Sequence, residues 1–195
     1  MNDTRNQILL AAYELFIKKG YKEVSIQEIT KSVGLTKGAV YYFFKNKEQL
    51  FQEVFNRLFI SEMHINFSKF SQDSLYKFYH DYLDHHMIFA QKEGEAGTIS
   101  ITFYSYMFDA MKSFPELVIG VRESFSQEKE AWIEVIEVAR SNGEIETTLS
   151  NEQVADLFIL TGDGFGMRGI ILGEMPGKSE QLVLLWDALY NSIKA

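Results

Sequence analysis

The stretch of sequence that decides the fold runs from Ser25 to Lys47 and reads SIQEITKSVGLTKGAVYYFFKNK. Its first part places apolar side chains three and four residues apart, as on one face of a helix: Ile26, Ile29 and Val33. Ser25 and Glu28 form a capping-box pattern that opens this helix, and Gly34 ends it. Thr36 can cap a second short helix that runs to about residue 44. Two short helices joined by a tight turn predict a helix-turn-helix.

Helices are also predicted on either side of this stretch. Thr4 and Gln7 form a capping box before the first helix, and Gly20 ends it. Its apolar face consists of Ile8, Leu9, Ala12, Leu15 and Phe16. Asn46 and Gln49 cap a fourth helix, whose apolar residues are Leu50, Val54, Phe55 and Leu58.

The remaining chain is also predicted to be helical, over about 73–92, 98–112, 116–141, 150–172 and 179–195. No stretch of useful length alternates apolar and polar residues as a strand would. The predicted fold class is therefore all-α. A three-helix head with a helix-turn-helix, residues 1–48, precedes a larger helical domain, residues 49–195.

Basic residues gather at the start of the chain, although its 195 residues carry a net charge of −8. Residues 1–50 hold eight Lys or Arg against five Asp or Glu, and residues 51–195 hold eleven against twenty-two. This pattern favours phosphate contact by the head alone, because an acidic surface repels a polyanion. Ordinary variation in surface charge would give the same totals, so composition leaves both interpretations open.

Composition excludes several classes of protein. The chain has no cysteine, which excludes disulfides, thiolate metal sites and cysteine nucleophiles. No apolar run approaches the ~18 residues of a membrane span, and the N-terminal residues lack the pattern of a secretion signal. We therefore expect a cytoplasmic protein with no membrane partner.

The second short helix has the side chains to enter the major groove of DNA with its N-terminal end leading. The Thr36 hydroxyl can bind a phosphate, and Lys37 can reach a phosphate or a guanine edge. Gly38 and Ala39 are small enough to let the backbone approach DNA closely.

Two tyrosines and a lysine complete this surface. Tyr41 and Tyr42 are adjacent on a helix and point about 100° apart, so at least one faces outward and can donate to a phosphate. Lys47 follows the Asn46 cap, where its charge adds to the positive end of the fourth helix and makes a phosphate clamp. Each residue alone also fits a helix cap or a solvated lysine, but their occurrence within one short stretch favours DNA binding.

Residues 5–52 resemble the DNA-binding region of the TetR/AcrR family of bacterial transcriptional regulators. The resemblance covers about a quarter of the chain and rests on Ala11–Phe16, Gly20-Tyr21, Ser25–Ile29 and Thr36-Lys37-Gly38-x-x-Tyr41-Tyr42-x-Phe44-x-x-Lys47-Glu48-x-Leu50. It implies a homodimer of all-α subunits, each with an N-terminal helix-turn-helix and a larger ligand-binding and dimerisation domain.

By position, the resemblance implies two sets of DNA contacts. Phosphates would be held by Ser25, Thr36, Tyr42 and Lys47. Bases would lie near Gln27, Lys37, Gly38, Ala39 and Tyr41. Family members often have histidine where this chain has Phe43, whose ring can touch a thymine methyl group but forms no hydrogen bond.

The sequence after residue 60 offers an aromatic-rich interior for an apolar or aromatic small molecule. We expect ligand contacts from Phe103, Tyr104, Phe108, Trp132 and Phe165, in an interior that also contains Tyr106 and Phe158. Ordinary core packing is the simpler explanation for any one of these residues.

No cofactor, metal or catalytic site is predicted. Asp81 and His85 have a spacing that could share a metal, but a solvated or pocket-lining helix face explains them better. A run of glycines lacks the strand and the Lys-Ser/Thr of a phosphate-binding loop, and close helix packing explains it better: Gly162, Gly164, Gly166 and Gly169. No nucleophile elbow or zinc-protease motif occurs.

The predicted function is a ligand-responsive transcriptional repressor that binds a palindromic operator in double-stranded DNA as a homodimer and is released by a small-molecule inducer. The fourth helix is the expected lever between ligand and DNA. Helices 150–172 and 179–194 are expected to form the dimer contact, with apolar residues Val154, Leu157, Phe158, Leu182, Leu185, Trp186 and Leu189. The alternative is a small all-α enzyme or ligand carrier with an incidental helix-turn-helix.

Overall fold

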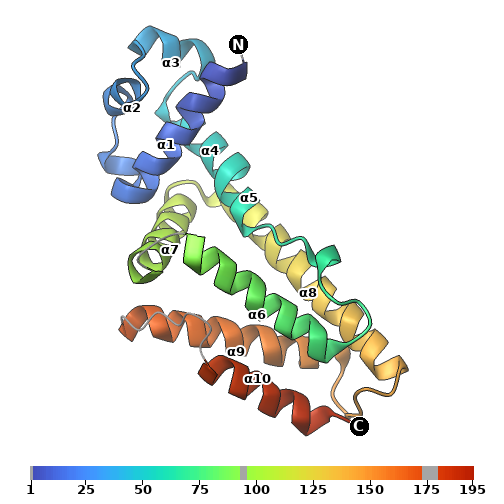
Figure 1. Cartoon of the computed structure of the whole chain (residues 1–195). Coiled ribbons are helices and arrows are strands. Elements are labelled where there is room, and N and C mark those ends of the chain that lie inside the picture. Colours follow the sequence, from blue (N-terminus) through green and yellow to red (C-terminus); the bar gives the residue numbers. More distant parts are fainter. Residues whose placement is uncertain (1, 93–95, 173–179) are drawn as a thin grey trace. The chain divides into compact units, whose positions relative to one another are not determined.

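The computed structural model describes residues 2–92, 96–172 and 180–195, and these are helical almost throughout (Figure 1). The α-helices are α1 (Asn2–Glu23), α2 (Ile26–Ser32), α3 (Lys37–Phe43), α4 (Lys47–Val54), α5 (Ile60–Met63), α6 (Leu75–Lys92), α7 (Ala96–Ser113), α8 (Val118–Ser141), α9 (Asn151–Leu172) and α10 (Glu180–Ile193). A π-helical turn, η1 (Phe55–Phe59), joins α4 to α5, and short 3-10 turns occur at η2 (Phe67–Lys69) and η3 (Pro115–Leu117). Within the described ranges the one strand-like pairing is an isolated bridge between Ile145 and Lys194. The all-α prediction is confirmed.

The predicted helix ends agree with the structure to within two residues for most helices, but the first helix differs at both ends. Ser25, Thr36 and Asn46 each cap the helix that was expected to follow them. The cap at Thr4 is wrong, because α1 begins at Asn2 and Thr4 lies inside it. Gly20 interrupts α1 with φ 78° and ψ 162°, and a last helical turn follows it. The predicted start at Ser179 lies outside the described residues.

The first of two compact units comprises Met1–His64 and Ile101–Ser124. In it, α2 and α3 pack together and α1 packs against both α2 and α4 (Figure 1). The fully buried Phe51 ring lies 5.0 Å from Phe16 and 4.7 Å from Tyr21, centroid to centroid. It also lies 5.4 Å from both Tyr106 and Phe114. One aromatic core therefore joins the head to the end of α7.

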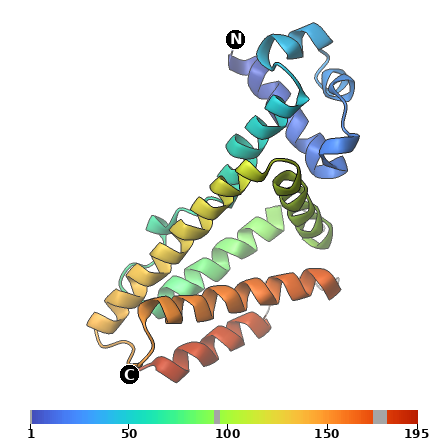
Figure 2. The ribbon, with the colours of Figure 1, turned by 180° about the vertical axis from the view of Figure 1, so that it is seen from behind.

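The second unit comprises Ile65–Ser100 and Phe125–Ala195. Its core is built on buried rings, among them Tyr79, Trp132, Phe158 and Trp186. Helices α9 and α10 pack side by side and run in opposite directions (Figures 1 and 2). The Glu144 carboxylate accepts from the backbone N–H groups of Leu75 (3.0 Å) and Tyr76 (2.9 Å), so it caps α6 from a distant loop.

Over the described parts of the chain, no helix combines the length and the apolar character needed to cross a lipid bilayer.

One glycine of α9 is required by packing. A Cβ atom on Gly162 would lie 2.8 Å from Cζ2 of Trp186, whose ring is buried. A Cβ atom on Gly166 would have no described atom within 4 Å. The two positions therefore form a matched pair on one helix.

We predict that Gly162→Ala lowers the free energy of unfolding by about 1–3 kcal/mol, because the added methyl group overpacks the core against Trp186. Gly166→Ala should leave stability unchanged or raise it by up to about 1 kcal/mol, because alanine favours helix. Urea unfolding followed by circular dichroism measures both. Equal stability of the two variants would contradict the contact between α9 and α10.

Candidate nucleic-acid interface

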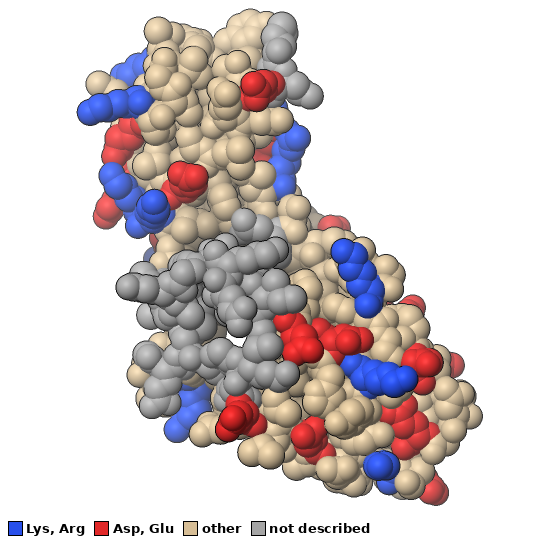
Figure 3. Space-filling view, viewed as in Figure 1, with Lys and Arg blue, Asp and Glu red and all other residues tan. Residues whose placement is uncertain are grey.

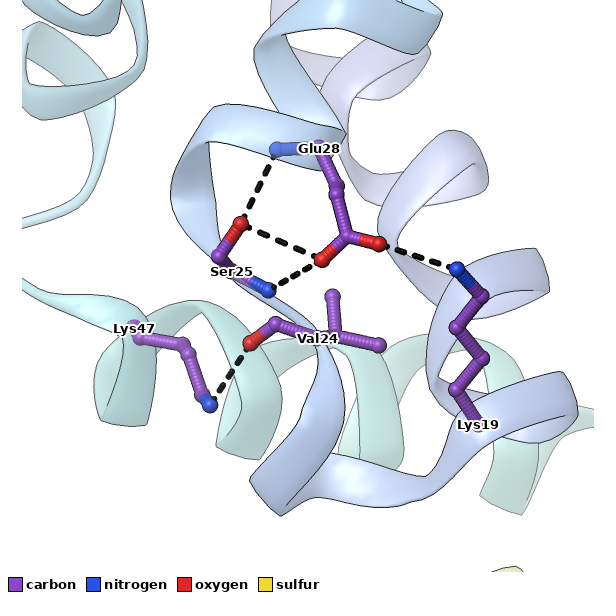
Figure 4. Close-up of polar contacts among 5 residues, drawn as sticks. All are labelled: Lys19, Val24, Ser25, Glu28 and Lys47. Atoms are coloured by element: carbon purple, nitrogen blue, oxygen red, sulfur yellow. Dashed lines mark hydrogen bonds and ion pairs between the residues drawn. The ribbon is translucent and has the colours of Figure 1, made fainter.

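The entrance to α2 is fixed by a charged capping box (Figure 4). The Glu28 N–H donates to the Ser25 hydroxyl at 3.2 Å, and Glu28 Oε2 accepts from the Ser25 N–H at 2.9 Å and from its hydroxyl at 3.1 Å. Lys19 of α1 donates to Glu28 Oε1 at 2.9 Å. These bonds, first of all the one from Lys19, lower the pKa of Glu28 to about 2. The network fixes α2 against α1.

Lys47 lies at the start of α4 and holds the chain that leads into α2 (Figure 4). Its ammonium donates to the carbonyl oxygen of Val24 at 2.7 Å and lies 4.3 Å from the centre of the Tyr21 ring. Burial lowers the pKa of Lys47. An ammonium carries three donors, so the Val24 bond leaves Lys47 able to donate to a phosphate as well.

Helix α3 has one buried side and one exposed side. Val40 and Phe44 are fully buried beneath it, in the same core as Ile29 of α2. Tyr41 and Tyr42 are 50% and 71% exposed. Two large aromatic side chains that stay exposed on a seven-residue helix contribute little apolar burial to the fold. Their exposure indicates a surface that contacts another molecule.

Two glycines near this surface have different structural roles. Gly34 lies in the turn between α2 and α3 with φ +67°, which favours glycine. Gly38 has no positive φ, and a Cβ atom there would meet only the Thr36 Oγ1 atom, at 3.8 Å. The fold therefore requires Gly34 but not Gly38.

Basic side chains are exposed throughout the head. The exposed lysines of residues 1–50 are Lys18, Lys19, Lys22, Lys31, Lys37 and Lys45. In the view of Figure 3, Lys and Arg lie on both flanks of the first unit, and acidic side chains gather over the second unit. The charge asymmetry of the sequence is thus present on the surface.

The structure brings the nine predicted DNA contacts together on α2, α3 and the start of α4. Ser25, Gln27, Thr36, Lys37, Gly38, Tyr41 and Tyr42 are exposed, and Ala39 and Lys47 are half-buried. The Thr36 hydroxyl accepts from the Ala39 N–H at 3.3 Å, and the Ser25 hydroxyl is engaged with Glu28. Phe43 packs against the core and against the Tyr42 ring, at 5.0 Å.

Sequence patterns did not reveal the residues that support this surface. Arg5 places its guanidinium 5.0 Å from the centre of the Phe44 ring and forms an ion pair with Glu53. Lys19 reaches Glu28 from a neighbouring helix. These partners are far apart in the chain, and no local spacing links them. Lys45, which is exposed between α3 and α4, also belongs to no sequence motif that would have singled it out.

The five predicted ligand contacts fall into both compact units. Phe103, Tyr104 and Phe108 belong to the first unit, where the ring centres of Tyr104 and Phe108 are 6.2 Å apart. Trp132 and Phe165 belong to the second, where Trp132 is fully buried and stacks on Phe158 at 5.2 Å. Three of the predicted ligand contacts therefore lie in the first unit and two in the second.

The described residues contain no group of three His, Cys, Asp or Glu side chains arranged to hold a metal ion.

The chain is similar in sequence to bacterial transcriptional regulators and in fold to solved structures. Residues 8–54 match the family model of "Bacterial regulatory proteins, tetR family". The transcriptional repressor BepR of Brucella suis is 24% identical over 166 residues, covering 84% of this chain and 78% of BepR. The transcriptional regulator QacR of Staphylococcus aureus is 48% identical over 52 residues, only 27% of this chain and 28% of QacR. A TetR transcription regulator of Haloarcula marismortui shares the fold, with a TM-score of 0.74 at 18% identity over 100% of both chains.

The low pKa of Glu28 predicts a specific loss of stability in acid. A carboxylate whose pKa falls from 4.5 to about 2 on folding stabilises the folded state above pH 4.5. That contribution disappears as the pH falls from 4.5 towards 2. The stability difference between the unmodified chain and Glu28→Gln should therefore be largest near pH 7 and shrink below pH 4.5, as measured by urea unfolding at a series of pH values.

Lys19→Met is the matched variant, because it removes the largest cause of the shift. It should make the loss smaller and complete it at a higher pH, because the folded-state pKa of Glu28 then lies closer to 4.5. A difference between the unmodified chain and Glu28→Gln that is constant from pH 7 to pH 3 would contradict the charged capping box.

Proposed function

We propose that this chain, which belongs to the TetR/AcrR family of bacterial transcriptional regulators, represses transcription by placing α3 in the major groove of a palindromic operator. The observation that carries the proposal is the exposure of Tyr41 and Tyr42 on a helix whose opposite side is anchored in the core of the first unit. BepR, the relative matched over most of its length, is itself a repressor.

The exposed side chains of the head divide into two roles in this proposal. Ser25, Thr36, Tyr42 and Lys47 hold phosphates and fix the register of the head on the duplex. Gln27, Lys37, Gly38, Ala39 and Tyr41 lie against base edges. Tyr42 is the more exposed tyrosine, which suits a phenol that reaches outward to the sugar–phosphate backbone.

Functionally, we assign residues 1–48 to DNA binding and 49–195 to effector binding and dimerisation. These functional boundaries differ from those of the two compact units. The first compact unit is defined by packing and also includes residues after 48. The effector is a small molecule with aromatic or apolar character, and the protein acts in the cytoplasm. An enzyme or ligand carrier is not favoured, because the relatives reported above are transcriptional regulators.

The lever from effector to DNA is the helical run from α4 through η1 to α5. Phe55 and Phe59 of this run pack on Tyr106 of α7, at 5.8 and 5.1 Å between ring centres. Gln52 donates to Glu116 at 2.7 Å. A shift of α7 would therefore move α4 and, through Lys47, the entrance to α2. A hundredfold loss of operator affinity needs only ~2.7 kcal/mol of coupling.

The dimer contact is proposed on α9 and α10. Val154, Phe158 and Trp186 do not supply it, because they are buried in the core of the second unit. The exposed apolar residues of these helices are Leu157, Leu160, Ile171, Leu172, Leu184 and Leu185. Leu160 and Leu184 are 63% and 67% exposed, as expected for residues that a second copy covers.

We predict that Gly38→Ala separates DNA binding from folding. The operator is first selected from a random duplex library with the full chain, and its affinity is then measured by fluorescence anisotropy. Gly38→Ala should leave thermal stability unchanged or slightly higher, because the Cβ atom has room. It should weaken operator binding about tenfold, because the methyl group lies between the backbone and the bases.

Gly34→Ala is the control for folding. Its positive φ predicts a loss of about 1–2 kcal/mol of stability. Unchanged operator affinity in Gly38→Ala would remove α3 from the DNA interface.

We predict that the chain sediments as a dimer at micromolar concentration and that Leu160→Glu with Leu184→Glu makes it a monomer. Both side chains are exposed in one copy, so a charge there opposes association without disturbing the core. Leu10→Glu, at an exposed position on α1, should remain dimeric. A double variant that stays dimeric would place the contact elsewhere.

A further inference from the structure

Arg5 on α1 joins that helix to two others of the first unit. Its guanidinium lies 5.0 Å from the centre of the Phe44 ring, at the end of α3, and forms an ion pair with Glu53 of α4. Both partners are shielded from solvent, because Phe44 is 1% exposed and the Glu53 side chain is 19% exposed. The charged end of Arg5 therefore faces into the first unit.

Phe44 is the residue at which α3 ends. Its backbone is extended, and its N–H donates to the Val40 carbonyl oxygen at 3.0 Å, which closes the last helical turn. Helix α3 packs on α2, and the cation–π contact from Arg5 attaches its C-terminal end to α1 as well. A guanidinium suits this position, because its flat face packs on a ring while its edge pairs with a carboxylate. Arg5 is thus placed to fix the direction in which α3 projects.

Glu53 pairs with a second arginine through the same oxygen atom. Its Oε1 accepts from Arg57 of η1 at 3.1 Å and also forms the ion pair with Arg5. Arg57 is the more exposed of the two arginines, with 54% of its side chain open to solvent against 28% for Arg5. Among the described contacts, Arg57 makes none with α3. The two arginines therefore share Glu53 and differ in the contact with Phe44.

We propose that Arg5 is a positioning residue for DNA binding: it holds α3, through Phe44, at the angle that fits the major groove, and it does not itself contact the duplex. Its guanidinium is engaged by a buried ring and a shielded carboxylate, whereas a phosphate contact requires a cation that faces outward. The two roles differ in their dependence on salt. The inference rests on the proposed function, because it requires that α3 reads DNA; the attachment of α3 by Arg5 does not.

Arg5→Met tests this role, because methionine keeps an apolar stem and loses the charge. The selected operator should bind about tenfold more weakly, while a duplex of unrelated sequence should bind within about twofold of the unmodified chain. The slope of log affinity against log salt concentration should stay unchanged, because no phosphate contact is lost. A slope that is flatter by about one unit would make Arg5 a phosphate contact and overturn the proposal.

Arg57→Met and Arg5→Lys are the matched variants. Arg57→Met removes the same charge from the same carboxylate, and it should bind the operator within about twofold of the unmodified chain. Arg5→Lys keeps a cation for Phe44 and Glu53 without the flat guanidinium, so its operator affinity should lie between those of Arg5→Met and the unmodified chain. An equal loss of operator affinity in Arg5→Met and Arg57→Met would assign the effect to the charge of Glu53 and overturn the proposal.

Amide hydrogen exchange of the free chain, measured by NMR, distinguishes this inference from the proposed function because it needs no DNA. Exchange of the Phe44 N–H should be at least about fivefold faster in Arg5→Met than in the unmodified chain or in Arg57→Met. Faster exchange in Arg5→Met, with no operator binding by the unmodified chain, would contradict the proposed function and leave the attachment of α3 standing. Equal operator affinity in the unmodified chain and in folded Arg5→Met would contradict this inference alone.

Discussion

The packing of Phe51 is the contact on which the first unit depends. Its fully buried ring lies 4.7 to 5.4 Å, centre to centre, from the rings of Phe16, Tyr21, Tyr106 and Phe114. Aromatic contacts of this kind combine large apolar burial with directional ring packing. Residues from α1, α4 and the end of α7 therefore share one core. The head has no separate core of its own, and this shared core is the contact through which we propose that a change in α7 reaches α4.

On this core, polar contacts set the exact direction of the short helices. A seven-residue helix is unstable in isolation. Helices α2 and α3 persist because Ser25 and Thr36 cap them and because the buried side chains of Ile29 and Val40 anchor them. Lys47 ties the start of α4 to the Val24 carbonyl. The exposed side chains of α3 therefore make few contacts within the fold. They are available to contact DNA.

The helix boundaries of the head could be predicted from sequence because they depend on residues close together in the chain. The features that could not be predicted depend on contacts between residues far apart in the chain. The caps at Ser25, Thr36 and Asn46 depend on residues three positions apart, which a sequence displays. The π-helical turn at Phe55–Phe59 has no such local pattern. Its rings pack against α7, whose residues are distant from it in the sequence. For the same reason periodicity alone assigned Trp186 to an outer surface, whereas the fold buries it beneath Gly162.

The central claim is that α3 and the start of α4 form the surface that meets DNA. Hydrogen–deuterium exchange of the full chain, with and without its selected operator, tests it most directly because it needs no mutation. We predict that operator binding slows exchange most strongly in residues 36–47, with smaller changes in α2. Binding that leaves residues 36–47 unchanged and slows exchange mainly in α9 and α10 would contradict the account.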